Sequence, residues 1–391
     1  MADATCAGCG CACDDIEVTE GRLVRTCPLG DRWFAERGGD RPPVARVDGR
    51  AVSLDEAVDT AAAILRQARA PLVYGLGQTS CEAQRRAVAL AEAAGAVVDP
   101  AGGGAGIPAF QAIGASTATF GEIRDRAELV VVWRADPVVT NPRLLERLRL
   151  ERATRGSRAL VVVDAQRTAT AEEGDAFFEL AAAHDFEALW ALRALVARAP
   201  LDRERVEAPL LDDLAERLLG ARHVAVIHGA VDELSALVLA SLVHDLSRDR
   251  HAVTLGLRTD GNGRGAEDVL AWQTGFPAAV SFARGSPRDG PGAATLLKRR
   301  EVDAALVVAS DPLEHLPALR ELPMVVVDAR ATATSEAAQV AFTTAADGIE
   351  VAGTVHRMDG VPVPLRAPLA GELGRAGPST EDVLAAIEGR L

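Results

Sequence analysis

Lysine is almost absent from this chain: Lys298 is the only one, and arginine supplies nearly all of the positive charge. Acidic residues outnumber basic ones, and the formal net charge of −14 argues against nucleic acid or an anionic membrane surface as the main partner. No apolar run reaches the length of a membrane span, and the first residues lack the charged and then apolar pattern of a signal segment. We therefore expect a cytoplasmic location.

Aromatic residues are also scarce, at 4% of the 391 residues. The hydrophobic cores must consequently be built mainly from alanine, valine and leucine. Hydrophobic residues nevertheless make up 48% of the chain and charged residues 25%, as in ordinary soluble globular proteins. A chain of this length is sufficient for two or three domains with separate cores.

Short apolar runs alternate with helical patterns from residue 54 onward. Residues 54–69 have helical periodicity with Ser53 as a candidate N-cap, and the run 71–77 ends in glycines as a buried parallel strand does. A helix at 82–94 leads to a strand at 96–99, and further strands are expected at 129–133 and 160–164. This alternation predicts a parallel sheet with helices on both faces.

The same pattern recurs in the second half of the chain. The run 223–229 resembles 71–77 and is followed by a long helix at 232–249. Further strands are expected at 252–255, 304–308 and 324–328. Two strands end alike, in the Asp-Pro turns Asp136-Pro137 and Asp311-Pro312. No G-x-G-x-x-G fingerprint occurs, so the sequence does not indicate NAD.

These patterns predict an α/β protein with two Rossmann-like parallel-sheet lobes, of the formate dehydrogenase-like kind, behind a small cysteine-rich N-terminal cap. We expect the cap at residues 1–50, the first lobe at 51–165 with 325–366 returning to its core, and the second lobe at 166–330. A tail with a final helix is expected at 367–391. In such sheets ligands bind beyond the carboxyl ends of the strands, where the glycines and Asp-Pro turns lie.

Cysteine is concentrated at the N-terminus, since five of the six cysteines lie within the first 27 residues. In a reducing cytosol such clustering indicates metal binding rather than disulfides. Four thiolates, from Cys6, Cys9, Cys13 and Cys27, would complete either an iron–sulfur cubane or a tetrahedral zinc site, with Cys11 as a spare. Spacing alone does not separate a cluster, a zinc ion and metal-free thiols.

The N-terminal pattern Cys6-x-x-Cys9-Gly-x-x-Cys13-Asp-Asp-Ile16 resembles that of the B subunits of formylmethanofuran dehydrogenases, which are relatives of the molybdopterin-dependent formate dehydrogenases. The resemblance continues in order along essentially the whole chain. Its further segments are residues 121–129 with Trp133, 136–137 and 141–143, residues 272–280 and 282–288, and residues 310–315, 347–350 and 353–362.

The resemblance implies a [4Fe-4S] cluster near the N-terminus and a tungsten or molybdenum ion on two pterin dinucleotides. It implies an activity that reduces carbon dioxide to formate, which another subunit joins to methanofuran. It also implies that a separate subunit supplies the pterin-capping domain that one-piece formate dehydrogenases carry at their C-terminus. The implied partners are hydrolase-like A and C subunits and a transferase-like D subunit of the same complex.

One departure from the family pattern bears directly on redox chemistry. Active members carry a cysteine that ligates the tungsten or molybdenum just before the segment at 121–129, and here Ala118 takes that position. No cysteine follows Cys81 in the sequence, so moving the alignment by a residue or so would not bring a cysteine to the ligand position. The resemblance therefore favours the B subunit of the bacterial formyltransferase/hydrolase complex, which moves a formyl group between carriers and releases formate without redox chemistry. The alternative is an active tungsten or molybdenum dehydrogenase with another ligand.

Five residues are candidates for contacts with the pterin that the family resemblance implies, in a cleft that would be vestigial here because the metal ligand is lost; each of the five has a structural explanation as well. Asp164 and Arg167 follow a strand, where turn chemistry also accounts for them. Arg284 and Arg288 could pair with phosphates or belong to a surface loop. His315 lies in a family motif, but a histidine in a loop more often makes a structural hydrogen bond. We expect the same structural role for His356, and either packing or ligand stacking for Trp272.

Overall fold

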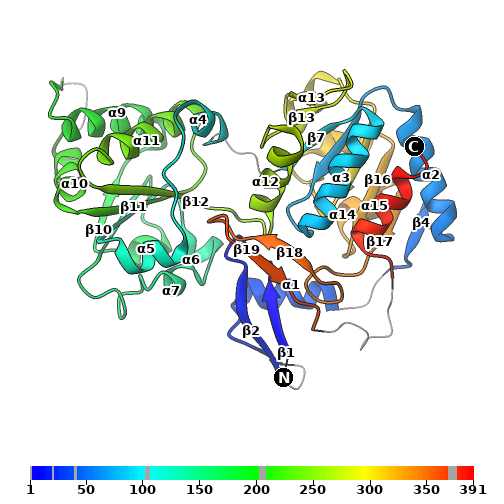
Figure 1. Ribbon diagram of the computed structural model, residues 1–391, viewed down its shortest axis with the longest axis horizontal. Helices are drawn as coiled ribbons and strands as arrows, with labels where there is room; N and C mark the ends of the chain where they lie inside the picture. The colour runs from blue at the N-terminus through cyan, green and yellow to red at the C-terminus, as the bar shows by residue number, and fades with distance from the viewer. Residues whose placement is uncertain (1, 20–21, 39–41, 102–105, 202–207, 369–376) are drawn as a thin grey trace. The chain divides into compact units, whose positions relative to one another are not determined.

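The computed structural model describes residues 2–19, 22–38, 42–101, 106–201, 208–368 and 377–391. The chain forms two compact units (Figure 1): the first contains residues 1–103 and 259–391, and the second contains residues 104–258. This division differs from the expected boundaries at residues 50, 165 and 330. The physical reason is strand pairing over long sequence distances: β15 (Ala304–Val308) pairs with β6 (Pro71–Gly75), whereas β8 (Leu129–Trp133) pairs with β11 (His223–His228).

The first unit is built on a nine-stranded sheet with the order β14-β13-β7-β6-β15-β16-β17-β4-β5. Its remaining strands are β4 (Ala45–Val47), β5 (Arg50–Ala51), β7 (Val97–Asp99), β13 (Val280–Ser281), β14 (Arg288–Asp289), β16 (Met324–Asp328) and β17 (Val340–Thr343). The five central strands, β7 to β17 in this order, are parallel, and the strands at both edges pair antiparallel. The sheet is therefore mixed rather than purely parallel.

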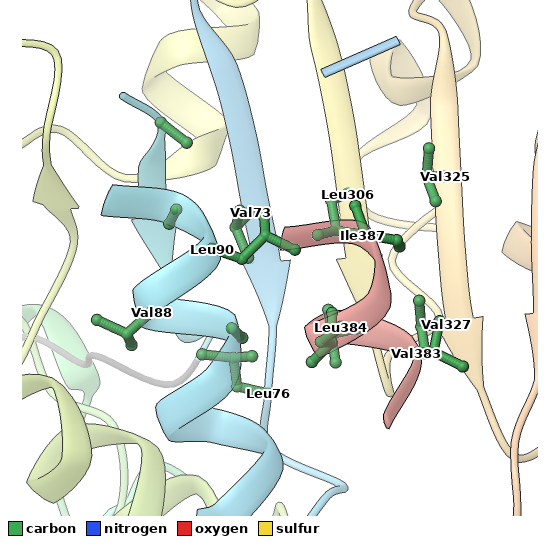
Figure 2. Close-up of a cluster of buried hydrophobic side chains, with 14 of the residues drawn as sticks. Val73, Leu76, Val88, Leu90, Leu306, Val325, Val327, Val383, Leu384 and Ile387 are labelled. Atoms are coloured by element: carbon green, nitrogen blue, oxygen red, sulfur yellow. The ribbon is translucent and has the colours of Figure 1, made fainter. Parts of the chain in front are cut away.

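Both faces of the parallel core of this sheet are covered. The helices on one face are α2 (Leu54–Gln67), α3 (Cys81–Ala94), α12 (Gly263–Thr274) and α15 (Thr380–Glu388), and α13 (Ala293–Arg299) and the 3₁₀ helix η2 (Pro317–Glu321) cover the other. Figure 2 shows Leu384 and Ile387 of α15 packed against Leu306 of the sheet and close to Val73. The C-terminal helix is thus part of the main core, and Ser379 begins it with a capping box.

The N-terminal residues of the first unit form a three-stranded antiparallel sheet, β1 (Ala2–Cys6), β2 (Cys13–Thr19) and β3 (Arg22–Val24), followed by α1 (Pro28–Gly38). A hairpin near the C-terminus, β18 (Gly353–His356) and β19 (Pro362–Leu365), holds this sheet. The hydroxyl of Thr5 donates to the Pro364 carbonyl at 2.8 Å, and the Met358 N–H donates to the Gly10 carbonyl at 2.8 Å. The cysteine-rich loop is therefore anchored by residues from the opposite end of the sequence.

The second unit contains a five-stranded parallel sheet with the order β10-β9-β8-β11-β12. Its other strands are β9 (Ala159–Asp164), β10 (Ala176–Glu179) and β12 (His251–Gly256). The helices α9 (Asp185–Val196), α10 (Ala208–Gly220) and α11 (Glu233–Leu246) pack on one face of this sheet. Two shorter helices, α4 (Gly106–Ile113) and α5 (Phe120–Arg126), precede the first strand of this unit. The others follow strands: α6 (Pro137–Thr140), α7 (Leu144–Arg147), α8 (Ala169–Glu173) and the 3₁₀ turn η1 (Ala182–His184).

Both sheets confirm the expected α/β class with buried parallel strands. The valine-rich runs at 129–133, 160–163 and 324–328 form central strands and are buried. Part of the expected C-terminal tail, residues 369–376, lies outside the described residues. Across the described part of the chain, no helix is both long enough and apolar enough to cross a membrane.

Candidate functional site

A polar cavity of about 320 Å³ lies in the first unit at the carboxyl ends of β6, β15 and β16, against helix α1. We call it the first-unit cavity. Gly75 ends β6 with a φ of +112°, and a Cβ there would collide with the Val308 carbonyl oxygen. Ala309 and Ser310 follow β15 and also line the cavity. Small residues at these strand ends therefore leave the space open, at the edge of the sheet where the sequence predicts a ligand.

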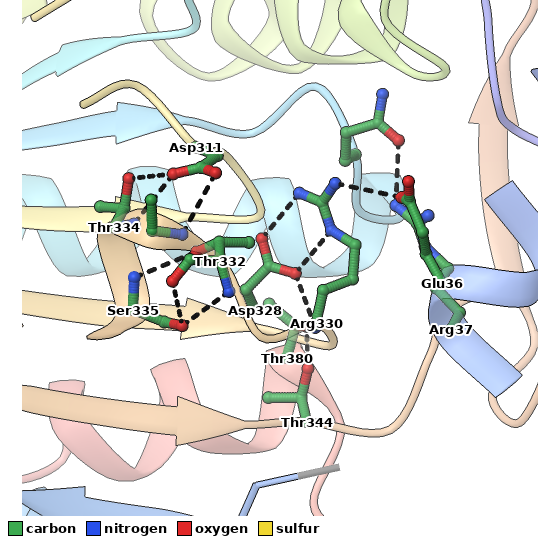
Figure 3. Close-up of polar contacts among 12 residues, drawn as sticks. Glu36, Arg37, Asp311, Asp328, Arg330, Thr332, Thr334, Ser335, Thr344 and Thr380 are labelled. Atoms are coloured by element: carbon green, nitrogen blue, oxygen red, sulfur yellow. Dashed lines mark hydrogen bonds and ion pairs between the residues drawn. The ribbon is translucent and has the colours of Figure 1, made fainter. Parts of the chain in front are cut away.

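Charged side chains of both signs surround this cavity. The basic ones are Arg32 and Arg37 of α1, His315 after β15 and Arg330 after β16, and the acidic ones are Glu36, Asp260 and Asp311. In Figure 3, Arg330 lies between Asp328 and Glu36, with two N–H···O bonds to Asp328 of 3.0 Å each and an ion pair to Glu36 at 3.8 Å. Side-chain carboxylates thus hold the Arg330 guanidinium in place beside the cavity.

Arg37 is the most buried of these arginines, with 3% of its surface exposed. Its guanidinium donates to the Gln78 Oε1 at 3.1 Å and to the Trp33 carbonyl at 3.2 Å, and it lies over the Trp33 ring. Burial, together with the neighbouring charge of Arg330, lowers the pKa of Arg37 to about 10. Two like charges are therefore held close together beside the cavity, and an anion bound there would be stabilised by both.

His315 faces the same cavity and is paired with Tyr74, whose hydroxyl lies 3.2 Å from the His315 Nε2. Burial raises the pKa of Tyr74 to about 12, and the carboxylates of Asp99 and Asp260 add to this effect. The phenol consequently keeps its proton at neutral pH and can donate it in this hydrogen bond. The arrangement fixes the orientation of the imidazole, which agrees with the structural role considered for this histidine.

The loop after β15 is held by a turn that uses Asp311. Its carboxylate accepts from the Thr334 N–H at 2.9 Å, from the Ala333 N–H at 3.3 Å and from the Thr334 hydroxyl, at the start of α14 (Ala333–Ala337). Figure 3 shows these contacts beside the Thr332–Ser335 capping box. The Asp-Pro turn therefore positions the loop, so Asp311 is committed to structure although it lines the cavity.

The N-terminal cysteines lie together in the loop between β1 and β2 and at the start of α1. Burial raises the pKa of Cys6, and the neighbouring thiols of Cys13, Cys9 and Cys27 raise it further. Hydrogen bonds to Cys13 and Cys9 raise the pKa of the buried Cys11. Burial is the largest cause for Cys6 and the neighbouring thiols are the largest for Cys11, and both shifts include the influence of nearby sulfur atoms. The expected thiol quartet and its spare member therefore share one environment.

Backbone groups also point toward two of these sulfur atoms. The Gly8 N–H donates to the Cys6 Sγ at 3.4 Å, and the Gly30 N–H donates to the Cys27 Sγ at 3.5 Å from the first turn of α1. Such bonds stabilise thiolates, so the donor chemistry fits an iron–sulfur cluster or zinc. Among the residues that the structure describes, however, no three His, Cys, Asp or Glu side chains are arranged so as to hold a metal ion. The metal assignment to Cys6, Cys9, Cys13 and Cys27 stays a prediction.

Ala118 lies in the second unit, immediately before Thr119, which is the N-cap of α5. It is 5% exposed, and its methyl group has no atom that can donate to a metal. The Thr119 hydroxyl accepts from the Glu122 N–H at 3.2 Å, and residue 117 pairs with Thr254 of β12. The backbone at this position is therefore well anchored.

The other candidate residues do not gather at the first-unit cavity. Asp164 and Arg167 belong to the second unit, where Asp164 lies 3.6 Å from Arg134 and the exposed Arg167 lies over the Phe177 ring. Arg284 and Arg288 are exposed on the edge of the nine-stranded sheet, Arg288 in β14. Of the five predicted residues, only His315 lines the cavity.

Sequence reasoning missed the arginines that do line the cavity. Arg330 lies two residues after β16, at the carboxyl end of a predicted strand, so the sequence could have identified it as a candidate. Arg37 lies on α1, and no local sequence pattern indicates its role. Cys81 is buried against Asn262, whose Nδ2 lies 3.6 Å from the sulfur, and burial raises its pKa to about 11. Cys81 is therefore a packed residue.

His356 and Trp272 also have structural environments. The His356 Nδ1 lies 2.7 Å from the Asp268 carboxylate, and the Trp272 ring packs edge-on against the imidazole at 5.3 Å. Burial acts to raise the pKa of Asp268, but the hydrogen bond from His356 and the charge of Arg264 outweigh it and hold that pKa below its usual value. This pair ties the β18–β19 hairpin to α12, consistent with the expectation for His356.

Comparison with known proteins places these features in a family. The chain is 33% identical to the B subunit of the tungsten-containing formylmethanofuran dehydrogenase 2 of Methanocaldococcus jannaschii, and the match covers 92% of each chain. It is 31% identical to the B subunit of the formyltransferase/hydrolase complex Fhc of Methylorubrum extorquens, over 80% of this chain and 87% of the relative. No protein-family model matches the chain.

The fold agrees with these relatives. A chain in the crystal structure of the formyltransferase/hydrolase complex FhcABCD from Methylorubrum extorquens, determined with methylofuran, aligns with a TM-score of 0.75 at 28% identity. The alignment covers 88% of this chain and 98% of that chain. Identity above 30% over most of both sequences, together with this structural match, shows that the chain belongs to the family of formylmethanofuran dehydrogenase B subunits.

Proposed function

We propose that this chain is the B subunit of a formyltransferase/hydrolase complex of one-carbon metabolism, in which it has a structural and not a redox role. The support comes from the similarity to the Fhc B subunit of Methylorubrum extorquens and from the fold match to a chain of FhcABCD. The partners would be the hydrolase-like A and C subunits and the transferase-like D subunit. The enzyme activity would belong to the complex, and this chain would be a non-catalytic subunit of it.

The observation that carries this proposal is Ala118. Alanine cannot ligate tungsten or molybdenum, and the second unit contains no cysteine at all. A metal at that position would lack the protein sulfur that tunes its coordination. Hydrolysis and transfer of a formyl group need no change in oxidation state, so a B subunit without the ligand remains useful as a framework for its partners.

The thiol quartet is the natural place for any metal that the chain retains. Cys6, Cys9, Cys13 and Cys27 would hold a [4Fe-4S] cluster, which supplies one-electron transfer when bound. The N–H groups of Gly8 and Gly30 would stabilise the ligating sulfur atoms. Zinc, or no metal, are the alternatives that the same thiols allow. None of the six cysteines, all of which lie among the described residues, is in a disulfide. We infer a cytoplasmic location for the chain, where a reducing environment keeps thiols from forming disulfides.

The two units would be Rossmann-like lobes behind the cysteine-bearing cap, and the first-unit cavity would be what remains of the family's pterin cleft. Its guanidinium groups, Arg37 and Arg330, would face the anionic part of a bound group, and His315 would add a hydrogen bond. These residues would bind and orient the ligand, and they would provide no redox chemistry. Ligand binding in the cavity would therefore be independent of dehydrogenase activity.

One observation favours a second candidate function, an active tungsten or molybdenum formylmethanofuran dehydrogenase. The chain is 33% and 30% identical to two tungsten-containing B subunits, from Methanocaldococcus jannaschii and Methanococcus maripaludis, over 92% of each chain. The cysteine quartet would then serve electron transfer to a pterin-bound metal. This candidate requires another ligand in place of the side chain at Ala118.

Metal analysis of the complex, purified without oxygen, separates the two candidates. The structural role predicts no stoichiometric tungsten or molybdenum and no formate-linked viologen reduction, whatever occupies the cysteines. About four irons and four sulfides in each copy of this chain would support the cluster without supporting redox catalysis. Stoichiometric tungsten with formate oxidation that is lost after growth without tungstate would establish the dehydrogenase instead.

A further inference from the structure

The amino ends of the strands in the second unit carry a group of arginines. Because all strands of this sheet are parallel, their amino ends lie together, opposite the carboxyl ends where such sheets bind small ligands. The residues immediately before β9 and β11 are Arg158 and Arg222, and α5 leads into β8. Five arginines and two carboxylates form what we call the amino-end patch: Arg124, Arg126, Arg149, Arg158, Arg222, Asp125 and Glu128.

The Asp125 carboxylate is close to three of these guanidinium groups. Arg124 donates to it from two nitrogen atoms, at 2.8 and 3.0 Å. The hydrogen bond from Arg124 is the main reason that the pKa of Asp125 is held below its usual value, and the charges of Arg149 and Arg158 add to the effect. One negative charge therefore has to serve several positive ones.

Backbone carbonyls, and no ion pair, fix Arg158 in this patch. Its guanidinium donates to the Arg124 carbonyl, to the Leu148 carbonyl at 2.9 Å and to the Arg149 carbonyl at 3.2 Å. Among the described residues, its buried Nε has no hydrogen-bond partner. Burial lowers the pKa of Arg158; the charge of Asp125 opposes this, and the nearby charge of Arg149 adds to it. The positive charge of Arg158 is thus only partly compensated.

Two further arginines of the patch, Arg126 and Arg149, are exposed, and no carboxylate in the described part of the chain forms an ion pair with them. Glu128 is already paired with Arg222 at 3.1 Å. Five guanidinium groups against two carboxylates leave an excess of three positive charges in the patch, although the formal net charge of the whole chain is −14.

The charges that flank the patch do not remove this excess. At the start of β12, Glu122 lies 3.2 Å from His251 and is therefore already in contact with a basic group. The remaining acidic residues of the loops before β9 and β12 each have an arginine as the next residue in the chain: Glu151-Arg152 and Asp249-Arg250. The patch is consequently a local basic surface on an acidic protein.

We propose that the amino-end patch is a docking surface for an acidic segment of a different protein chain, whose carboxylates pair with Arg126 and Arg149. Arginine is favoured at protein interfaces, and its guanidinium binds a carboxylate through two parallel hydrogen bonds. A nucleic acid fits less well, because the strongly negative remainder of the chain repels a long polyanion. The inference rests on the proposed assembly with other subunits, and not on the absence of redox chemistry.

Site-specific cross-linking of the assembled complex tests this proposal. The chain has a single lysine, Lys298, which lies in the first unit. Arg126→Lys and Arg149→Lys keep the positive charge, and each introduces a side-chain amine into a unit that has none. A carbodiimide joins this amine to a carboxylate in contact with it: an amide bond forms, and the carbodiimide takes up the lost water and becomes a urea. Peptide mass spectrometry should find residues 126 and 149 joined to acidic residues of another subunit.

Arg167→Lys is the matched control, because Arg167 is an exposed arginine of the same unit that follows β9 at its carboxyl end. It should give far fewer links between chains. Equal yields from the control, links only to a second copy of this chain, or no links while the complex stays assembled would overturn the proposal and leave the proposed function standing. A chain that purifies without any partner would contradict both.

Charge reversal supplies a second measurement that does not depend on cross-linking. Arg126→Glu/Arg149→Glu should raise the dissociation constant of the chain from its complex roughly tenfold at low salt, and the difference should shrink as salt is added. Both side chains are exposed, so the melting curve of the isolated chain should stay unchanged. Unchanged assembly of the folded variant would overturn the proposal, and loss of single-stranded DNA binding in its place would assign the patch to nucleic acid.

Discussion

The Asp185 carboxylate offers a direct measure of how much the buried pair of Arg134 and Asp185 stabilises the second unit. Asp185→Ala removes the partner that makes three contacts with Arg134 and leaves a guanidinium that is 8% exposed. Breaking a buried pair in this way costs about 3–5 kcal/mol, because one charge stays buried without compensation. Asp164, at 3.6 Å, remains as a weaker partner, so we expect the lower end of this range, about 3 kcal/mol.

The assay is urea unfolding followed by pulse hydrogen exchange of peptides from β8 and β11, which reads the second unit separately from the first. With a urea dependence of about 2 kcal/mol per molar, the midpoint should fall by about 1.5 M. The matched control is Asp213→Ala, which breaks an exposed pair with Arg217 on α10 and should cost at most about 0.5 kcal/mol.

The double variant Arg134→Gly/Asp185→Ala completes the test of this reasoning. It removes both charges and gives the left-handed position a glycine, so it should recover about 1 kcal/mol or more relative to Asp185→Ala. A double variant as unstable as Asp185→Ala would show that the uncompensated charge is not the cause. An Asp185→Ala variant no less stable than Asp213→Ala would refute the buried pair altogether.

Three further predictions concern the first unit. Burial raises the pKa of Asp347, although hydrogen bonds from Thr79 and Ser80 oppose this effect. The folded protein therefore favours the protonated carboxyl group. The stability that Asp347 contributes is complete below about pH 4 and is lost as the pH rises through the raised pKa. Asp347→Asn should remove this dependence from melting curves between pH 4 and pH 8, and an unchanged slope would contradict it. Cys6→Ser should release bound iron and sulfide and lower the melting temperature, whereas the buried Cys81→Ser should keep the metal; equal metal contents would count against the proposed ligands. Leu384→Ala should cost about 2–5 kcal/mol in urea unfolding because Leu384 is fully buried, and similar losses for the 61% exposed Leu234→Ala would disprove that reasoning.

Several elements of the fold were readable from local sequence. The helix that begins after Ser53 follows from a side-chain cap and an apolar stripe, and this cap forms as expected. The valine-rich runs that became β8, β9 and β16 are buried on both faces, which is why they read as continuous apolar strands. Local patterns of this kind are sufficient because cap and period are set by neighbouring residues.

Only part of the site could be predicted from the sequence, because its residues come from elements that are distant along the chain. His315 follows a strand in a recognisable motif and does line the first-unit cavity, but Arg37 reaches it from a helix that begins after the cysteine loop. Asp164, Arg167, Arg284 and Arg288 also have strand-end signals, yet they belong to the other unit or to a sheet edge. A strand-end signal identifies a position in an element, whereas a cavity depends on which elements become neighbours.

By itself, then, the sequence determined the α/β class, the positions of the strands, the clustered cysteines, the family resemblance and the alanine at residue 118, since each is a property of adjacent residues. Only the tertiary structure decided that residues 304–308 pair with residues 71–75, and that the second unit is inserted within the first. It also decided that Arg134 is buried against Asp185, 51 residues away. These contacts depend on sheet register and long-range packing, which no local pattern of residues specifies.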